Sequence, residues 1–235
     1  MASPSQQAET EGTRNDTLET PTEDQLPAIP SATAHVNAKT EDMTPLRLEL
    51  PFQDQVLSGL RAGHWVWLEG TMYSMGHLAG QRLVSEIKQG LPTAIHLEQQ
   101  SIYFSTPSPA PFGKVIGSFD PEISAPFNRI AVHLLTAGVR CVVGYGPRNH
   151  DVIEAIKRGR GLYLHAPGGA GALLARCVLQ SEIVAYPDLG LEAIRRIKVS
   201  LFPALIAVDA FGRDLFHAYH TSQKHQRAST GEIIL

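Results

Sequence analysis

Two glycine-rich turns constrain the fold of this chain more than any other feature of its sequence. They lie at residues 68–80 and 165–176, and each follows a short apolar run and precedes a run with helical spacing. A strand–turn–helix unit of this kind directs unpaired backbone N–H groups to one point, which attracts anions. No lysine or arginine lies among the glycines of either turn. The sequence therefore predicts the architecture of a small-anion pocket without the charges that would complete it.

Composition narrows the functional classes. Hydrophobic residues make up 43% of the 235 residues, which is enough for a buried core. The net charge of −3 and the scattered basic residues predict that the chain binds neither nucleic acid nor a membrane. Cys141 and Cys177 lie in apolar runs, which indicates buried thiols in a reducing compartment. We expect a cytoplasmic protein with no cofactor and no metal site on this chain.

The composition changes along the chain and divides it into three parts. Residues 1–45 are rich in Ser, Thr, Pro, Glu and Gln, and no aromatic residue precedes Phe52. Such a segment buries too little apolar surface to offset its ordering entropy, so we predict a disordered tail. Residues 46–217 form the predicted folded domain, and residues 218–235 form a predicted loose C-terminal tail.

Strand-like and helix-like runs alternate through the predicted domain. The runs predict strands at 46–50, 65–68, 101–105, 114–118, 140–144, 162–165, 182–186 and 204–208. They predict helices at 75–89, 130–136, 150–158 and 170–179. This alternation favours an α/β layered fold.

Five motifs resemble one protein family in their order and spacing. They are Gly-Thr-Met-Tyr at 70–73, Gly-Lys-Val-Ile-Gly-Ser at 113–118, Gly-Tyr-Gly-Pro-Arg at 144–148, Gly-Gly-Ala-Gly-Ala-Leu-Leu-Ala-Arg-Cys at 168–177 and Ala-Tyr-Pro-Asp-Leu-Gly-Leu-Glu-Ala-Ile at 185–194. Together they resemble the β subunit, or C-terminal domain, of the iron–sulfur hydro-lyases, the class I fumarases and L-tartrate dehydratases. The resemblance covers about residues 46–217 and implies a swivelling β/β/α domain. It also implies a separate α part that carries a four-iron cluster, with this domain closing over the substrate.

The chain departs from the family where the resemblance places the substrate. Gly76 occupies the position where the resemblance implies a substrate-binding arginine. Pro126 occupies the position of a second arginine, which in the family holds a carboxylate. Glu122 occupies the position of the family threonine that is the proposed base, and Tyr145 occupies the position of a family lysine. Because charge-assisted pairs hold dicarboxylates, the loss of three cations predicts weak binding of fumarate or tartrate.

The candidate site residues each have a functional and a structural interpretation. Glu122 is the candidate catalytic residue, as a replacement general base, or else a solvated loop carboxylate. The candidate substrate-binding residues are Thr71, Ser124, Tyr145, Arg148, Gly168 and Gly169. The hydroxyls could instead cap helices, Tyr145 could fill the lysine's space, and Arg148 could pair with an acidic residue on its own helix. The two glycines could cradle an anion or permit close helix–strand packing.

Three functional hypotheses follow. The first is a degenerate β-type hydro-lyase subunit, a pseudoenzyme candidate that assists or regulates a cluster-bearing α-type partner. The second is an active lyase or hydratase with an altered carboxylic-acid substrate. The third is a stand-alone module, or a homodimer, that binds a small metabolite.

Overall fold

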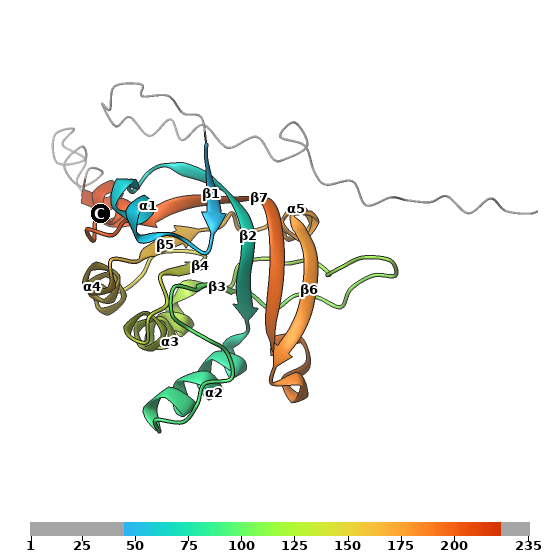
Figure 1. The fold of residues 1–235 in the computed structure, drawn as a ribbon. Coiled ribbons are helices and arrows are strands. Elements are labelled where there is room, and N and C mark those ends of the chain that lie inside the picture. Colours follow the sequence, from blue (N-terminus) through green and yellow to red (C-terminus); the bar gives the residue numbers. More distant parts are fainter. Residues whose placement is uncertain (1–44, 222–235) are drawn as a thin grey trace, which may run out of the picture.

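A long antiparallel strand pair is the basis of the architecture. In the computed structural model, which describes residues 45–221, β2 (Trp65–Met75) pairs with β7 (Ile194–Val208) almost along its whole length. β2 also pairs with β3, and β7 also pairs with β5. Strands β2, β3, β4, β5 and β7 therefore close into a ring of hydrogen-bonded neighbours, as Figure 1 shows.

The remaining elements extend or cover this ring. The other strands are β1 (Leu46–Leu50), β3 (Ser101–Phe104), β4 (Cys141–Gly144), β5 (Leu162–His165) and β6 (Val178–Ala185). The helices are α1 (Asp54–Gly59), α2 (His77–Lys88), α3 (Ser124–Thr136), α4 (His150–Gly159), α5 (Gly171–Arg176) and the 3-10 segment η2 (Pro187–Glu192). β1 to β5 are mutually parallel, whereas β6 and β7 run antiparallel to their neighbours.

Two hydrophobic cores define the layers. Alternate side chains of each strand point to opposite faces, so Cys141 and Val143 of β4 join one core and Val142 joins the other. The first core packs strands against one another and against α1 and α5. The second core packs the strands against α2, α3 and α4. This is the β/β/α layering that the family resemblance implies, and the predicted α/β class is confirmed.

Each predicted strand or helix other than the strand at 114–118 has a counterpart in the structure, but several bounds differ. β2 and β7 are much longer than the strands predicted at 65–68 and 204–208, and β6 and α3 begin before the elements predicted at 182–186 and 130–136. The predicted strand at 114–118 is wrong, because these residues form a bend within a long loop between β3 and α3. Ile116 enters the first core, but β3 already has β2 and β4 as its neighbours, so no strand partner remains there. The predicted helix at 170–179 ends at Arg176, because Val178 pairs with Val199 and begins β6.

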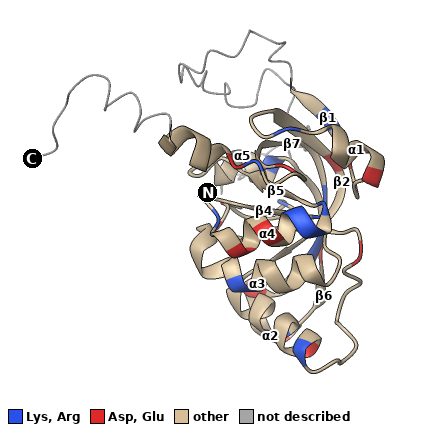
Figure 2. Ribbon diagram, turned by 90° about the vertical axis from the view of Figure 1, so that its left-hand side faces the viewer, with Lys and Arg blue, Asp and Glu red and all other residues tan. Residues whose placement is uncertain are grey.

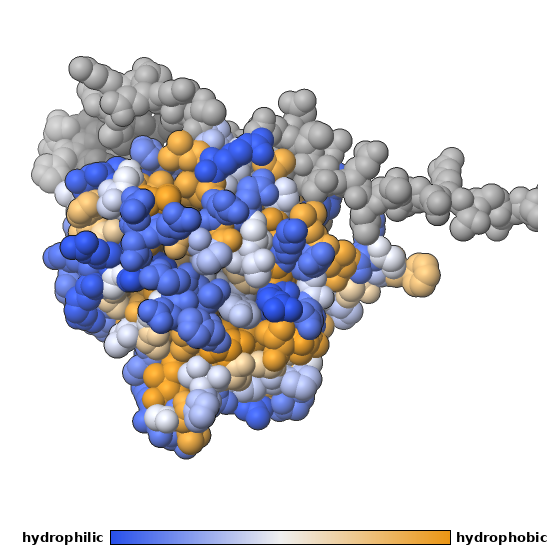
Figure 3. Space-filling model, viewed as in Figure 1, coloured by the Kyte–Doolittle hydropathy of each residue, from blue (hydrophilic) through white to orange (hydrophobic). Residues whose placement is uncertain are grey.

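The predicted tails fall largely outside the described residues. Residues 1–44 and 222–235 are not described, whereas residues 215–221 are helical. No helix of the described part is both long and apolar enough to cross a bilayer. On the face shown in Figure 2, basic and acidic residues are interspersed over α2, α3 and α4. Figure 3 shows apolar groups distributed among polar ones on another face.

Gly70 lies where β1 and β2 approach each other closely. It has φ 110°, and a Cβ atom there would lie 2.5 Å from the carbonyl oxygen of Leu50. We expect Gly70→Ala to lower the free energy of unfolding by about 2 kcal/mol or more, since both the conformation and the backbone contact oppose it. Gly59→Ala is the matched control, because nothing lies within 4 Å of its Cβ position. Urea unfolding measures both variants, and equal losses would contradict the prediction.

Candidate functional site

The candidate site lies where the parallel strands end. The segments that follow β2, β3, β4 and β5 begin with Gly76, Ser105, Tyr145 and Ala166, at one edge of the sheet. Ligands of parallel α/β sheets bind outside the carboxyl ends of the strands. This edge is therefore the position at which the sequence-predicted residues should meet.

Glu122 is held at this edge by backbone and side-chain contacts. Its N–H donates to the carbonyl of Phe104 at 2.9 Å, and its carbonyl accepts from the N–H of Tyr145 at 3.2 Å. The hydroxyl of Thr106 donates to Glu122 Oε1 at 2.5 Å. The segment around Glu122 thus bridges the ends of β3 and β4, and its carboxylate has a fixed hydroxyl neighbour.

Gly76 is surrounded by groups that fill the space of a side chain. A Cβ atom at Gly76 would lie 2.6 Å from Cγ of Glu192 and 2.6 Å from Oγ1 of Thr106. Glu192 Oε2 also accepts from the N–H of Leu78 at 2.7 Å, at the start of α2. A carboxylate there complements the helix dipole. Glu192 therefore caps α2 from η2, and an arginine at position 76 would displace it.

The second glycine-rich turn is also tightly packed. A Cβ atom at Gly168 would lie 2.6 Å from the ring of Tyr145, and one at Gly171 would meet the carboxylate of Asp120. Gly169 differs, because it has φ 74° and nothing within 4 Å of its Cβ position. The turn therefore accommodates Tyr145 and Asp120 against its backbone.

Arg148 lies beneath the site rather than on its surface. It is 6% exposed, its Nη1 donates to the carbonyl of Ser124 at 3.0 Å, and its guanidinium lies 4.5 Å from the ring centre of Tyr163. Burial lowers the pKa of Arg148. Its Nε and Nη2 have no hydrogen-bond partner within the described part of the chain. Arg148 thus holds the β4–α4 loop against the start of α3.

Tyr163 and His165 support the same loop. The hydroxyl of Tyr163 donates to the carbonyl of Gly146 at 2.6 Å and lies 2.8 Å from Oγ of Ser124. His165 Nδ1 accepts from the N–H of Gly146 at 3.2 Å, and burial lowers the pKa of this imidazole. The rings of His165 and Tyr145 lie 5.1 Å apart. Ser124 is therefore a buried partner within this network.

Thr71 lies apart from the other predicted residues. It sits in the middle of β2, opposite Lys198 of β7. It lines a groove of about 350 Å³ formed by β2, β6 and β7, together with Gln180, Ser181, Glu182, Arg196 and Lys198. The structure brings Glu122, Ser124, Tyr145, Arg148 and Gly168 together but leaves Thr71 on another surface.

The charges at the edge favour cations over dianions. Asp120, Glu122 and Glu192 are carboxylates, and the ion pairs found among residues 45–221 involve other acidic residues. The guanidinium of Arg148 contacts Ser124 and Tyr163 and holds the β4–α4 loop. A dicarboxylate entering here would be repelled by the carboxylates of Asp120, Glu122 and Glu192.

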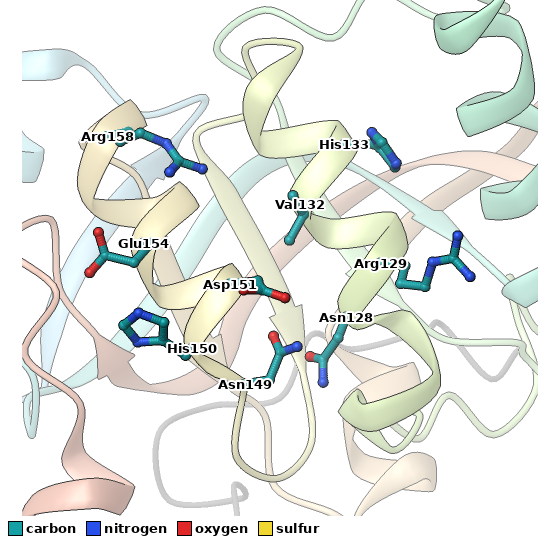
Figure 4. Close-up of a pocket in the computed structure, with 9 residues that line it drawn as sticks. All are labelled: Asn128, Arg129, Val132, His133, Asn149, His150, Asp151, Glu154 and Arg158. Carbon is teal, nitrogen blue, oxygen red and sulfur yellow. The ribbon is translucent and has the colours of Figure 1, made fainter.

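A second groove lies between α3 and α4. It has a volume of about 480 Å³ and is lined by Asn128, Arg129, Val132, His133, Asn149, His150, Asp151, Glu154 and Arg158. Figure 4 shows Val132 and Asp151 facing each other across it, whereas Arg129 and His133 lie on the side of α3 away from α4. None of the sequence-predicted site residues lines it. Asn128 connects it to the site, because its Oδ1 lies 3.5 Å from Nη1 of Arg148.

The described residues do not offer a metal centre. No group of three or more His, Cys, Asp or Glu residues within 45–221 is arranged to hold a metal ion. Cys141 and Cys177 are buried free thiols, and burial raises the pKa of both, to about 12 for Cys177. Because iron–sulfur clusters need thiolate ligands, such a cluster does not fit this part of the chain.

Sequence reasoning missed three residues of the site. Thr106 follows the end of β3, and Glu192 lies 114 residues from Leu78, which it contacts. His165 is the last residue of β5. The rule that sites form at strand ends could have identified Thr106 and His165. Glu192 lies within one of the five motifs, but its partner could be found only from the fold.

The fold is an α/β domain whose parallel strands end at one edge, which is where such sheets commonly bind ligands. The Fumarase C-terminus family model matches residues 12–219, and this chain belongs to that family. Fumarate hydratase 2 of Leishmania major is 30% identical over 193 residues, covering 81% of this chain and 34% of the relative. The aerobic class I fumarate hydratase of Salmonella typhimurium is 32% identical over 158 residues, which cover 66% of this chain and 27% of the relative. The chain therefore spans about a third or less of these two relatives.

A third relative has a more similar length. A putative L(+)-tartrate dehydratase subunit beta of Methanocaldococcus jannaschii is 27% identical over 163 residues. The match covers 67% of this chain and 84% of that subunit.

His165 should make stability depend on pH. Burial lowers its folded pKa below the ordinary value of 6.5, so the unfolded chain binds the proton first as the pH falls. Its stabilising contribution is complete above pH 6.5 and is lost as the pH falls through that value towards the folded pKa. We expect the urea midpoint of the wild type to fall more steeply than that of His165→Gln between about pH 7 and about pH 5. Parallel curves for the two proteins would show that the half-buried imidazole of His165 is not responsible.

Proposed function

We propose that this chain is the β-type half of a two-part cytoplasmic hydro-lyase assembly, in which a separate α-type chain carries the iron–sulfur cluster. In this proposal the chain assists or regulates the partner rather than gripping a dicarboxylate itself. The single observation that carries it is the charge at the edge where the parallel strands end: Gly76, Pro126 and Tyr145 stand at positions for which the family resemblance implies cations, and Glu122 and Glu192 add carboxylates.

A relative that is named as a subunit supports an α-type partner. The match covers 84% of a putative L(+)-tartrate dehydratase subunit beta, and a protein of that name acts beside another subunit. No group of three or more His, Cys, Asp or Glu residues within the described part of this chain could hold a metal ion, so the proposal assigns the cluster to the α-type part.

The contact between Thr106 and Glu122 favours one second candidate. A general base must lie within hydrogen-bond reach of the proton that it removes. Glu122 is half-buried at the substrate edge, and its carboxylate is oriented by Thr106. In this alternative the assembly is an active lyase or hydratase, Glu122 is the base, and the substrate is a carboxylic acid other than fumarate or tartrate.

Co-purification tests the assembly. The probe is the cluster-bearing α-type hydro-lyase subunit of the same organism, co-expressed anaerobically with the tagged full-length chain. We expect a stable complex whose turnover of fumarate and L-tartrate is at least about a hundredfold below that of a family pair with the arginines and lysine in place, because charge-assisted contacts are missing. The proposal fails if the α-type subunit does not co-purify.

Glu122→Gln separates the two candidates. The matched control is Glu182→Gln, because Glu182 is exposed and pairs with Arg196 at 2.7 Å on β6, away from the site. The reconstituted complex is assayed on a panel of mono- and dicarboxylic acids. If Glu122 is the base, its variant should lose about a hundredfold or more of any measured rate, whereas the control keeps it. An unchanged rate in Glu122→Gln would remove the second candidate.

A further inference from the structure

A rigid projection leaves the candidate site between β3 and α3. We call residues 108–118 the proline arm; its sequence is Ser-Pro-Ala-Pro-Phe-Gly-Lys-Val-Ile-Gly-Ser. In Figure 1 this segment follows β3 and extends away from the body of the molecule on the right of the view. Pro109 to Val115 are all exposed, so the tip contacts solvent rather than the domain.

The base of the arm is firmly held. The N–H of Ser108 donates to the carbonyl of Ser118 at 2.9 Å, and the N–H of Ser118 donates to Oγ of Ser108 at 2.9 Å. A Cβ atom at Gly117 would meet the backbone of Ser108, so the two sides of the neck touch. Ile116 and Phe119 are buried in the first core. The projection is therefore anchored where it leaves the domain.

The tip carries an aromatic side chain with no partner in the described domain. Phe112 has a relative exposure of 106%, which is that of a free side chain. The N–H of Lys114 donates to the carbonyl of Pro111 at 3.0 Å and closes a turn around it. Figure 3 shows apolar atoms at the end of the projection. A phenyl ring held in water loses the free energy of burial, and burying it against another molecule would recover that free energy.

Proline makes the arm suited to docking. Pro109 and Pro111 fix backbone φ angles on either side of Ala110, and the turn at Lys114 fixes the return. A segment that is ordered before binding loses little conformational entropy when it binds. The arm therefore presents Phe112 as a preorganised anchor, which is the kind of residue that dominates protein interfaces.

The arm is continuous with the candidate site. Phe119 follows the neck directly, and its N–H donates to the carbonyl of Gly171 at 3.0 Å. Asp120 follows, and its carbonyl accepts from Oγ of Ser105 at 2.6 Å. Glu122 lies four residues beyond Ser118. A molecule that covers the carboxyl ends of the strands would therefore meet the arm at the border of the same surface.

We infer that the proline arm docks this chain onto its α-type partner, with Phe112 inserted into an apolar pocket of that partner. This inference rests on the proposed function, which supplies the partner. Lys114 is the one charged residue of the arm, so the pocket should carry an acidic residue at its rim. Because the arm continues into residues 119–122, docking also fixes Glu122 relative to the partner.

Phe112→Ala tests the anchor in the full-length chain. Its side chain contacts nothing in the described domain, so thermal unfolding should be unchanged. The affinity for the α-type subunit should fall by about ten- to a hundredfold, mostly through faster dissociation, because the burial of one phenyl ring is lost. Leu91→Ala is the matched control: Leu91 is 50% exposed and follows α2, outside the arm. It should bind the α-type subunit as the wild type does.

The outcomes distinguish the docking role of the proline arm from the proposed assembly with an α-type subunit. If the wild type and Phe112→Ala bind the α-type subunit equally, the docking role of the arm is wrong and the proposed assembly stands. If the wild type does not bind at all, the proposed function fails and the inference falls with it. Size-exclusion chromatography with light scattering adds a third measurement. Loss of a homodimer in Phe112→Ala, with α-type binding retained, would assign the arm to self-association and overturn the inference.

Discussion

The antiparallel pairing of β2 with β7 is the constraint on which the structure depends. It joins residues more than a hundred positions apart and closes five strands into a ring. Once the ring is closed, alternate side chains must face either its inner core or the helices, which accounts for the two cores. Within the ring, β2 to β5 are parallel, so their carboxyl ends lie at one edge. The position of the site is thus a consequence of the topology.

At that edge, close packing determines the chemistry. Three glycines allow side chains from elsewhere in the chain to approach the backbone: Glu192 at Gly76, Tyr145 at Gly168 and Asp120 at Gly171. Each of these side chains occupies space that a larger residue would need. Two of the three are carboxylates, so the packing that completes the fold also makes the edge acidic. Repulsion of a dianion and the stability of the domain therefore have the same structural origin.

Local patterns predicted much of the fold but not its long-range contacts. β1, α2, α4 and β5 were evident because the spacing of apolar residues and the glycines at their ends are local signals. The strand expected at 114–118 failed because its apolar residues serve the anchored neck of an arm. Glu122, Tyr145 and Gly168 could be grouped through motifs that follow strands. Glu192 could not, because its contact with Leu78 depends on how η2 folds back onto α2. Thr71 shows the converse: its motif lies on β2, the strand that leads to the site, but its side chain lines another groove.

The motif residues differ in whether they stabilise the fold or set the charge of the candidate site. Arg148 is buried and joins Ser124 and Tyr163 in the clamp on the β4–α4 loop, so the fold needs it whether or not a ligand binds. Pro126 is exposed, so the fold places few demands on its side chain, whereas the ring of Tyr145 packs against the turn at Gly168. The roles of Arg148 and of the carboxylates at the edge are therefore separable. Arg148 supports the loop, and Asp120, Glu122 and Glu192 set the charge that a ligand would meet.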